Sequence, residues 1–130
     1  MDWDDLVMRA SAATVHAYAP YSGYVVGAAA ICDNGRVITG CNIENASYGL
    51  SLCAECALVA QLHLTGGGRL VKIVCVDGLG GVIPPCGRCR QILWEHGGAT
   101  LEVLTATGER RLSELLPEAW DASDLKSGRV

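Results

Sequence analysis

Two short cysteine motifs constrain the fold of this chain more than any other feature of its sequence. The first is Cys53-Ala54-Glu55 and the second is Pro85-Cys86-Gly87-Arg88-Cys89. Each motif precedes a pattern that predicts a helix, and glycines end these helices at 66–68 and 97–98. Helix N-termini carry free N–H groups and a positive dipole, which stabilise thiolates. Since a metal ion shared by both motifs would join the two helix starts, the motifs predict a fold in which those starts face each other.

The donor atoms of these motifs suit zinc, and two kinds of zinc site are compatible with them. Cys53, Cys86 and Cys89 supply three thiolates, which leaves the fourth tetrahedral position open for water, as in a catalytic site. On a helix Glu55 points away from Cys53, and it can accept a proton from such a water. With Cys56 added, the cysteines also form the pattern of a closed structural site, which their spacing alone favours. The carboxylate of Glu55 favours the catalytic interpretation.

Length and charge limit the class of protein. A chain of 130 residues, half of them apolar, has the size of a single domain with its own core. The net charge is −4 and the basic residues are scattered, which argues against nucleic acid as a partner. The sequence contains no apolar run long enough to cross a membrane, and its acidic start, Met1 to Asp5, is unlike a secretory signal. We therefore expect one domain, in the cytoplasm and without a membrane partner.

The remaining cysteines and the histidines are expected to be structural. The chain has seven cysteines, and an odd number without a signal peptide favours reduced thiols over disulfides. Three of them lie in apolar, strand-like stretches and are expected to be small core residues: Cys32, Cys41 and Cys75. The histidines lie near predicted helix ends, where we expect surface or capping roles: His16, His63 and His96.

Hydrophobic periodicity and turn residues predict alternating helices and strands. Helices are predicted over Asp2–Ala17, Cys53–Leu64 and Gly87–His96, with a helical turn over Ser113–Leu116. Strands are predicted over Tyr24–Ile31, Arg36–Cys41, Leu70–Val76, Thr100–Thr105 and, at an edge, Arg110–Leu112. The segment from Asp77 to Pro85 is expected to be a loop, and the polar tail from Lys126 to fray. This order predicts a mixed sheet with helices on both faces.

From about Pro20 to Leu116 the sequence resembles the cytidine deaminases of the small homotetrameric type. The resemblance rests on segments in the family's order and spacing: Pro20-Tyr21-Ser22, Val26-Gly27-Ala28-Ala29, the stretch from Gly40 to Leu50, Cys53-Ala54-Glu55, and Pro85 to Gln91. It implies a single cytidine deaminase-like domain over 1–130 with a three-layer α/β/α sandwich and a five-stranded mixed sheet. It also implies a homotetramer that takes a small-molecule nucleoside substrate.

The resemblance further implies a reaction and its residues. The reaction is hydrolysis of cytidine and 2′-deoxycytidine to uridine and 2′-deoxyuridine with release of ammonia, a step of pyrimidine salvage. One Zn²⁺ per subunit is implied, with Cys53, Cys86 and Cys89 as ligands and Glu55 as proton shuttle. The positions that hold the substrate are matched by Asn42 and Glu44 for the ribose hydroxyls, Tyr24 for stacking near the pyrimidine, and Ala54 for a backbone contact to it.

Two features of the sequence concern neighbouring subunits and charge. Tyr48 matches a loop that the family places at a subunit interface, and Trp120 matches an aromatic residue that reaches a neighbouring site. Many members carry arginine directly after the glutamate, where its charge offsets the thiolates, but this chain has Cys56 there. We expect Cys56 to be a neutral packing thiol, with Arg88, Arg90 and the helix dipoles as sources of positive charge.

Two other functions are compatible with the same residues. A non-catalytic module with four cysteine ligands would serve assembly or partner binding. A deaminase acting on another aminopyrimidine nucleoside or on a blasticidin-like compound would keep the chemistry and change the substrate, although Asn42 and Glu44 favour ribose. Deamination within a polynucleotide is disfavoured because the acidic chain lacks a track of positive charge for phosphates.

Overall fold

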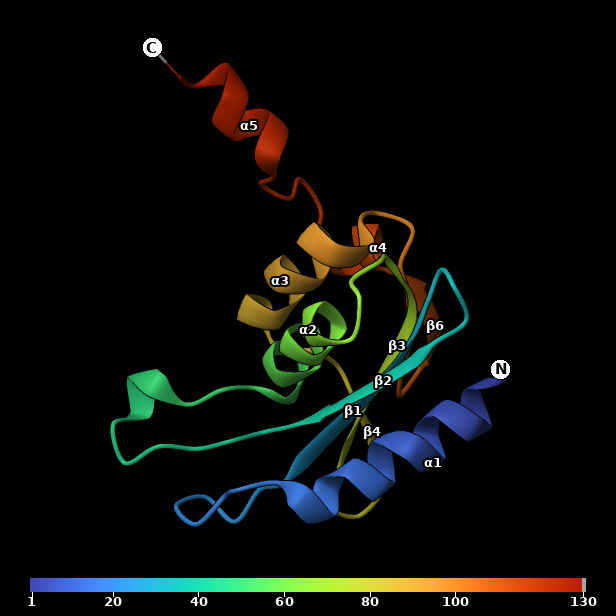
Figure 1. Ribbon diagram of the computed structural model, residues 1–130, viewed down its shortest axis with the longest axis vertical. Helices are drawn as coiled ribbons and strands as arrows, with labels where there is room; N and C mark the ends of the chain where they lie inside the picture. Colours follow the sequence, from blue (N-terminus) through green and yellow to red (C-terminus); the bar gives the residue numbers. More distant parts are fainter. Residues whose placement is uncertain (130) are drawn as a thin grey trace.

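The computed structural model of the chain describes residues 1–129 and is built around one mixed sheet (Figure 1). The strand order is β2-β1-β3-β5-β6, and the short strand β4 also pairs with β3. The strands are β1 Val26–Cys32, β2 Val37–Cys41, β3 Leu70–Asp77, β4 Val82–Ile83, β5 Glu102–Thr105 and β6 Gly108–Arg111. Only the β3–β5 pair is parallel among the strand pairs of residues 1–129; the others are antiparallel. The mixed sheet that the sequence predicted is confirmed, with β4 as an additional short strand.

Helix α1 (Trp3–Ala13) covers one face of the sheet (Figure 1). Its N-terminus is capped by the carboxylate of Asp2, which accepts a hydrogen bond from the backbone N–H of Asp5 at 2.9 Å. Leu6 and Ala10, one turn apart, are fully buried and pack with apolar residues of the sheet, namely Ala29, Val74 and Val76. The amphipathic stripe of the sequence therefore forms the first of two cores. A 3-10 turn, η1 (Thr14–His16), follows the helix.

The opposite face of the sheet is covered by α2 (Ala54–Leu64), α3 (Gly87–Gly97) and α4 (Leu112–Leu115). Leu58 and Leu62 of α2 and Leu93 of α3 are fully buried in the larger core on this side. The chain is thus a three-layer α/β/α sandwich, as the resemblance implied, because apolar side chains alternate between the two faces of the central strands β1 and β3.

Gly40 on β2 determines how closely α2 approaches the sheet. A Cβ at this position would lie 2.4 Å from the carbonyl oxygen of Ala54 and 2.5 Å from the backbone nitrogen of Leu58. The first turn of α2 therefore packs directly on the backbone of β2, an approach that only glycine permits. This contact fixes the position of the end of α2 that carries Cys53 and Glu55.

The remaining elements differ in part from the prediction. The first strand begins at Val26 rather than Tyr24, and β4 interrupts the predicted loop over 77–85. The tail was expected to fray from Lys126, but helix α5 (Ala122–Ser127), which projects away from the body of the molecule, includes Lys126 and Ser127 (Figure 1). Asp121 caps this helix by accepting a hydrogen bond from the backbone N–H of Ser123 at 2.9 Å. Within residues 1–129, no helix combines the length and the apolar character needed to cross a membrane.

Candidate active site

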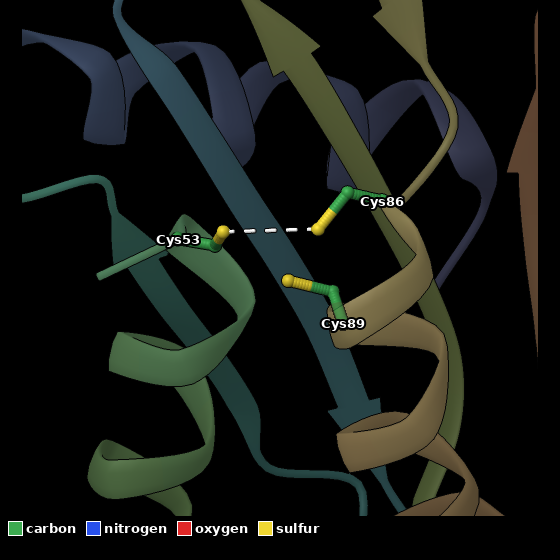
Figure 2. Close-up of side chains that lie close together, drawn as sticks. All are labelled: Cys53, Cys86 and Cys89. Atoms are coloured by element: carbon green, nitrogen blue, oxygen red, sulfur yellow. Dashed lines mark hydrogen bonds between the residues drawn. The ribbon is translucent and has the colours of Figure 1, made fainter. Parts of the chain in front are cut away.

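The two cysteine motifs meet at the N-terminal ends of α2 and α3 (Figure 2). Cys53 is the N-cap residue of α2, Cys86 is the N-cap residue of α3, and Cys89 lies in the first turn of α3. Figure 2 shows the three sulfur atoms directed toward one another; all lie within 4.8 Å, and those of Cys53 and Cys86 are 3.8 Å apart. The predicted meeting of the two helix starts is confirmed.

The spacing of the sulfur atoms fits a tetrahedral metal ion. With a Zn–S bond of about 2.3 Å, two thiolates on tetrahedral zinc stand about 3.8 Å apart. Cys56 does not belong to this group, although it follows Cys53 by only three residues. A site with three thiolates and one open position therefore fits the structure better than a closed site with four cysteines.

The thiols do not ionise as uniformly as the helix ends alone predict. The pKa of Cys86 is lowered: burial opposes this, but hydrogen bonds from the backbone and thiol of Cys89 outweigh it. Burial raises the pKa of Cys53, and it raises that of Cys89 further, with the charge of Glu55 adding to the rise. The expectation that both helix ends lower their thiol pKa values is wrong for Cys53 and Cys89, because desolvation exceeds the effect of the dipole. Three crowded thiols of this kind suit a divalent cation that compensates their charge.

Glu55 is the buried acid of the site. Its side chain is only 4% exposed, and among residues 1–129 it is the one charged residue in the buried class. Burial raises the pKa of Glu55, while hydrogen bonds that include the thiols of Cys89 and Cys75 act in the opposite direction. A carboxylate with a raised pKa beside a metal site is suited to accept and return a proton at neutral pH.

Cys75 and Cys32 are core residues as predicted, whereas Cys41 is only half-buried.

A cavity of about 430 Å³ opens in front of the thiols. Cys53 and Cys86 line the cavity together with Glu55 and Ala54. Its outer wall includes Asn42, Glu44 and Tyr48, which come from the loop that follows β2. The structure thus brings together most of the predicted site residues in one cavity, which has the volume of a small-molecule site.

The carboxylate of Glu44 is held by the loop before β1. It accepts hydrogen bonds from the backbone N–H of Tyr21 at 3.0 Å and of Ser22 at 3.1 Å, and another from the Ser22 hydroxyl. The Ser22 hydroxyl is the largest cause of the lowered pKa of Glu44. Tyr21 and Ser22 also line the cavity, a role that the sequence reasoning did not assign. The signal was present, because both belong to the Pro20-Tyr21-Ser22 segment of the resemblance.

The amide of Asn42 is tied to the same segment. Its Oδ1 accepts a hydrogen bond from the backbone N–H of Val26 at 2.8 Å, and its Nδ2 donates one to the carbonyl of Tyr24 at 2.9 Å. These bonds fix the orientation of the amide, which still borders the cavity. Two polar groups from one loop, each locked by the segment over 21–26, form a rigid hydrogen-bonding wall.

The predicted aromatic contacts are only partly found in the cavity. Tyr48 lines it and is 78% exposed; its ring meets that of Tyr21 edge to face with centroids 6.4 Å apart. Tyr24 is 51% exposed and is absent from the cavity wall, where Val26 lies instead. Trp120 is 56% exposed, and its carbonyl accepts a hydrogen bond from Gln91 Nε2 at 2.8 Å. Within a single chain, neither Tyr24 nor Trp120 contributes to the cavity.

Arg88 supplies positive charge next to Cys56. One of its guanidinium nitrogens lies 3.7 Å from the Cys56 sulfur, and the other donates to the Ser51 carbonyl at 3.4 Å. The nearby Cys56 sulfur raises the pKa of Arg88, first through the attraction that it exerts when ionised and then through the hydrogen bond. Arg90 serves another purpose: its guanidinium donates to the carbonyls of Pro85 and Leu115, at 2.9 and 2.8 Å. Of the two arginines proposed from sequence, Arg88 is therefore the one placed to offset the thiolates.

The fold and the thiol cluster define a zinc-binding α/β protein, and comparisons with known proteins agree. The family described as the cytidine and deoxycytidylate deaminase zinc-binding region matches residues 1–105. A cytidine deaminase of Mycobacterium tuberculosis is 57% identical over 129 residues, covering 99% of this chain and 97% of that protein. One from Halalkalibacterium halodurans is 41% identical, with coverage of 96% and 98%.

Solved structures give the same result. The crystal structure of cytidine deaminase from Mycobacterium tuberculosis superposes with a TM-score of 0.91 at 58% identity, covering 93% of this chain and 98% of that one. The structure of cytidine deaminase from Burkholderia pseudomallei has a TM-score of 0.83 at 41% identity, with coverage of 92% and 100%. The chain belongs to the family of cytidine and deoxycytidylate deaminases. It is therefore an enzyme of a zinc-dependent class, and its thiol cluster fits Zn²⁺.

Proposed function

We propose that this protein hydrolyses cytidine and 2′-deoxycytidine to uridine and 2′-deoxyuridine with release of ammonia. The observation that carries this proposal is a buried carboxylate, Glu55, next to three converging thiols, in a cavity whose lining includes the polar side chains of Asn42 and Glu44. The relatives at 57% and 41% identity are named cytidine deaminase, which supports the same substrate. A place in pyrimidine salvage follows from that reaction.

The roles of the inner residues follow from their positions. Cys53, Cys86 and Cys89 hold the zinc ion, which when bound supplies Lewis-acid activation of the attacking water. Glu55 accepts a proton from that water as its oxygen attacks C4 of the pyrimidine. The carboxyl group then delivers this proton to the ring nitrogen N3, takes the second proton from the hydroxyl that the attack places on C4, and passes it to the amine. The C4–N bond breaks as the C4 carbonyl forms, and ammonia leaves. Burial of Glu55 excludes bulk water, so the proton stays within the site.

The outer residues orient the nucleoside. Glu44 and Asn42 are proposed to bind the ribose hydroxyls, since a carboxylate accepts and an amide donates hydrogen bonds. The bonds from Ser22 and Val26 hold both groups in place before substrate arrives, which reduces the ordering cost of binding. The backbone of Ala54 is proposed to contact the pyrimidine, because a small side chain leaves room for the ring beside Glu55.

We further propose that the single domain over 1–130 assembles as a cytoplasmic homotetramer. Large apolar side chains on the loops around the cavity stay exposed in one chain, among them Tyr21, Tyr48 and Leu50. Contact with neighbouring chains would bury them. In that assembly Tyr48 and Trp120 would contact neighbouring subunits, and Tyr24 would complete the pyrimidine pocket.

The test is ammonia release from cytidine and 2′-deoxycytidine by the purified protein and by Glu55→Gln, with bound zinc measured in both. We expect the variant to lose turnover by about 10²–10⁴-fold or more, because the amide cannot transfer the proton. Its zinc content should remain equal, since Glu55 lies outside the thiol group. The control is Glu95→Gln, a change on the exposed face of α3 that should leave turnover unaltered. Equal turnover in the two variants, or none in the zinc-loaded parent, would contradict the proposal.

A further inference from the structure

A second pair of side chains connects α2 and α3 at their other ends. Nε2 of His63, in the last turn of α2, lies 3.0 Å from Nε2 of His96, in the last turn of α3. The ring centroids are 5.1 Å apart and the ring planes meet at 79°. The sequence predicted surface or capping roles for these histidines and gave no sign that they meet. The thiols join the N-terminal ends of the same two helices, so α2 and α3 are in contact at both ends.

We propose that His63 and His96 form a second metal site, which binds one divalent ion of the class that prefers imidazole, such as Ni²⁺ or Cu²⁺. With metal–imidazole bonds of about 2.05 Å, nitrogens at the observed separation subtend an angle of about 94° at the ion. This is close to the right angle of square-planar or octahedral coordination. Tetrahedral zinc would require nitrogens about 3.35 Å apart. The pair therefore suits Ni²⁺ and Cu²⁺ better than a second zinc ion.

The hydrogen bonds of His96 prepare its Nε2 as a ligand. Its Nδ1 lies 2.9 Å from the carbonyl oxygen of Ile92, so Nδ1 carries the hydrogen and donates it. In the neutral ring, Nε2 of His96 then presents a lone pair, which can accept a hydrogen from Nε2 of His63. This is the arrangement of a metal-bound histidine, whose other ring nitrogen donates to a backbone carbonyl. His63 becomes the second ligand when its hydrogen moves to Nδ1, which changes the tautomer without removing charge.

The surroundings favour a cation that enters from solvent. Both histidines lie in the last turn of a helix, where the partial negative charge of the helix dipole attracts positive charge. His63 is exposed and His96 is half-buried, so water has access to the remaining coordination positions. Among residues 1–129, the three cysteines are the only group of three or more metal-binding side chains, so the histidine pair acts as a two-ligand site. It lies about 15 Å from the thiols, one helix length away.

The test is a calorimetric titration of the zinc-loaded protein with Ni²⁺, repeated for His63→Gln and His96→Gln. We expect one Ni²⁺ per chain and a rise in the thermal midpoint of unfolding, because the ion links α2 to α3. Each variant should weaken Ni²⁺ binding by about 10²-fold, since one imidazole lacks the chelate effect. The matched control is His16→Gln on η1, which should bind Ni²⁺ like the parent. All three variants should keep their zinc and their basal turnover.

Two readouts on the unaltered protein distinguish this site from exchange at the cysteines. Ni²⁺ at the histidines should broaden the ring-proton signals of His63 and His96 and leave the near-ultraviolet spectrum free of thiolate-to-nickel charge transfer. Zinc displacement with a charge-transfer band would overturn the proposal. Binding that is equal in the parent, His63→Gln and His96→Gln would also overturn it, and so would the absence of Ni²⁺ binding.

Discussion

Substitution of Gly40 by alanine should damage the site although Gly40 itself does not line the cavity. The new Cβ would lie 2.4 Å from the Ala54 carbonyl oxygen, whereas tolerated contacts begin between 3.0 and 3.4 Å. The first turn of α2 must therefore move by about 0.6–1 Å. That turn carries Cys53 and Glu55, and a misplacement of about 1 Å costs on the order of 10²-fold in rate.

Stability should fall at the same time. Overpacking of this kind typically costs about 1–3 kcal/mol, because both clashing atoms belong to the backbone and cannot rotate away. For a domain of this size the thermal midpoint should drop by about 3–12 °C. The assays are calorimetric unfolding, zinc content and the kcat/KM for cytidine.

The matched control is Gly27→Ala on β1. Its Cβ would lie 1.9 Å from the carbonyl oxygen of Ala10, so it forces α1 away from the opposite face of the sheet. Since α1 carries no residue of the proposed site, this variant should lose stability but keep most of its kcat/KM once folded. The reasoning is refuted if Gly40→Ala keeps kcat/KM within about twofold of the parent, or if both variants lose activity in proportion to stability.

Two further predictions concern charges near the site. Ser22→Ala removes the hydroxyl that does most to lower the pKa of Glu44. Glu44 should therefore become protonated at a higher pH in the variant than in the parent, and its ionised form is the better hydrogen-bond acceptor for the ribose. As the pH is lowered, the KM for cytidine should begin to rise at a higher pH in Ser22→Ala than in the parent, with kcat little changed. Coincident KM profiles of the two proteins from pH 4.5 to 7 would contradict this. Arg88→Gln removes the guanidinium beside Cys56, so a chelator should extract zinc about tenfold faster or more. Adding Cys56→Arg to this variant should restore the retention of zinc, because a guanidinium on α2 replaces the positive charge that was lost. If the double variant loses zinc as fast as Arg88→Gln, the proposed role of Arg88 is refuted.

The parts of this structure that could be predicted from sequence are those set by local pattern. The helices after Cys53 and Cys86 follow from apolar periodicity and from the glycines that end them, and both were found within two residues of their predicted limits. The meeting of the two motifs followed from the chemistry of zinc, which needs ligands from both. Strand β4 was missed because a pair of residues, Val82 and Ile83, carries too little periodicity to stand out within a glycine-rich loop.

Contacts between distant segments could not be predicted in the same way. The bond from Ser22 to Glu44 and the pair of His63 with His96 depend on how loops and helix ends pack, and neither leaves a periodic signal. The raised pKa values of Cys53 and Cys89 have the same origin, since desolvation is a property of the packed site and not of the motif. The sequence therefore identified the reacting groups better than it identified what holds and tunes them.

The packing of α2 explains how Glu55 and the thiols can be buried and still be held in a fixed position. The helix is fixed against β2 through Gly40, and its N-cap cysteine meets those of α3 within 4.8 Å. Its far end meets α3 again through His63 and His96. A helix held on one side by backbone contact and at both ends by its neighbour has little freedom to shift, so Glu55 keeps its place beside the thiols without a hydrogen-bond partner of opposite charge. This rigidity is what allows a carboxylate to remain desolvated, with a raised pKa, at the point where a proton must be moved.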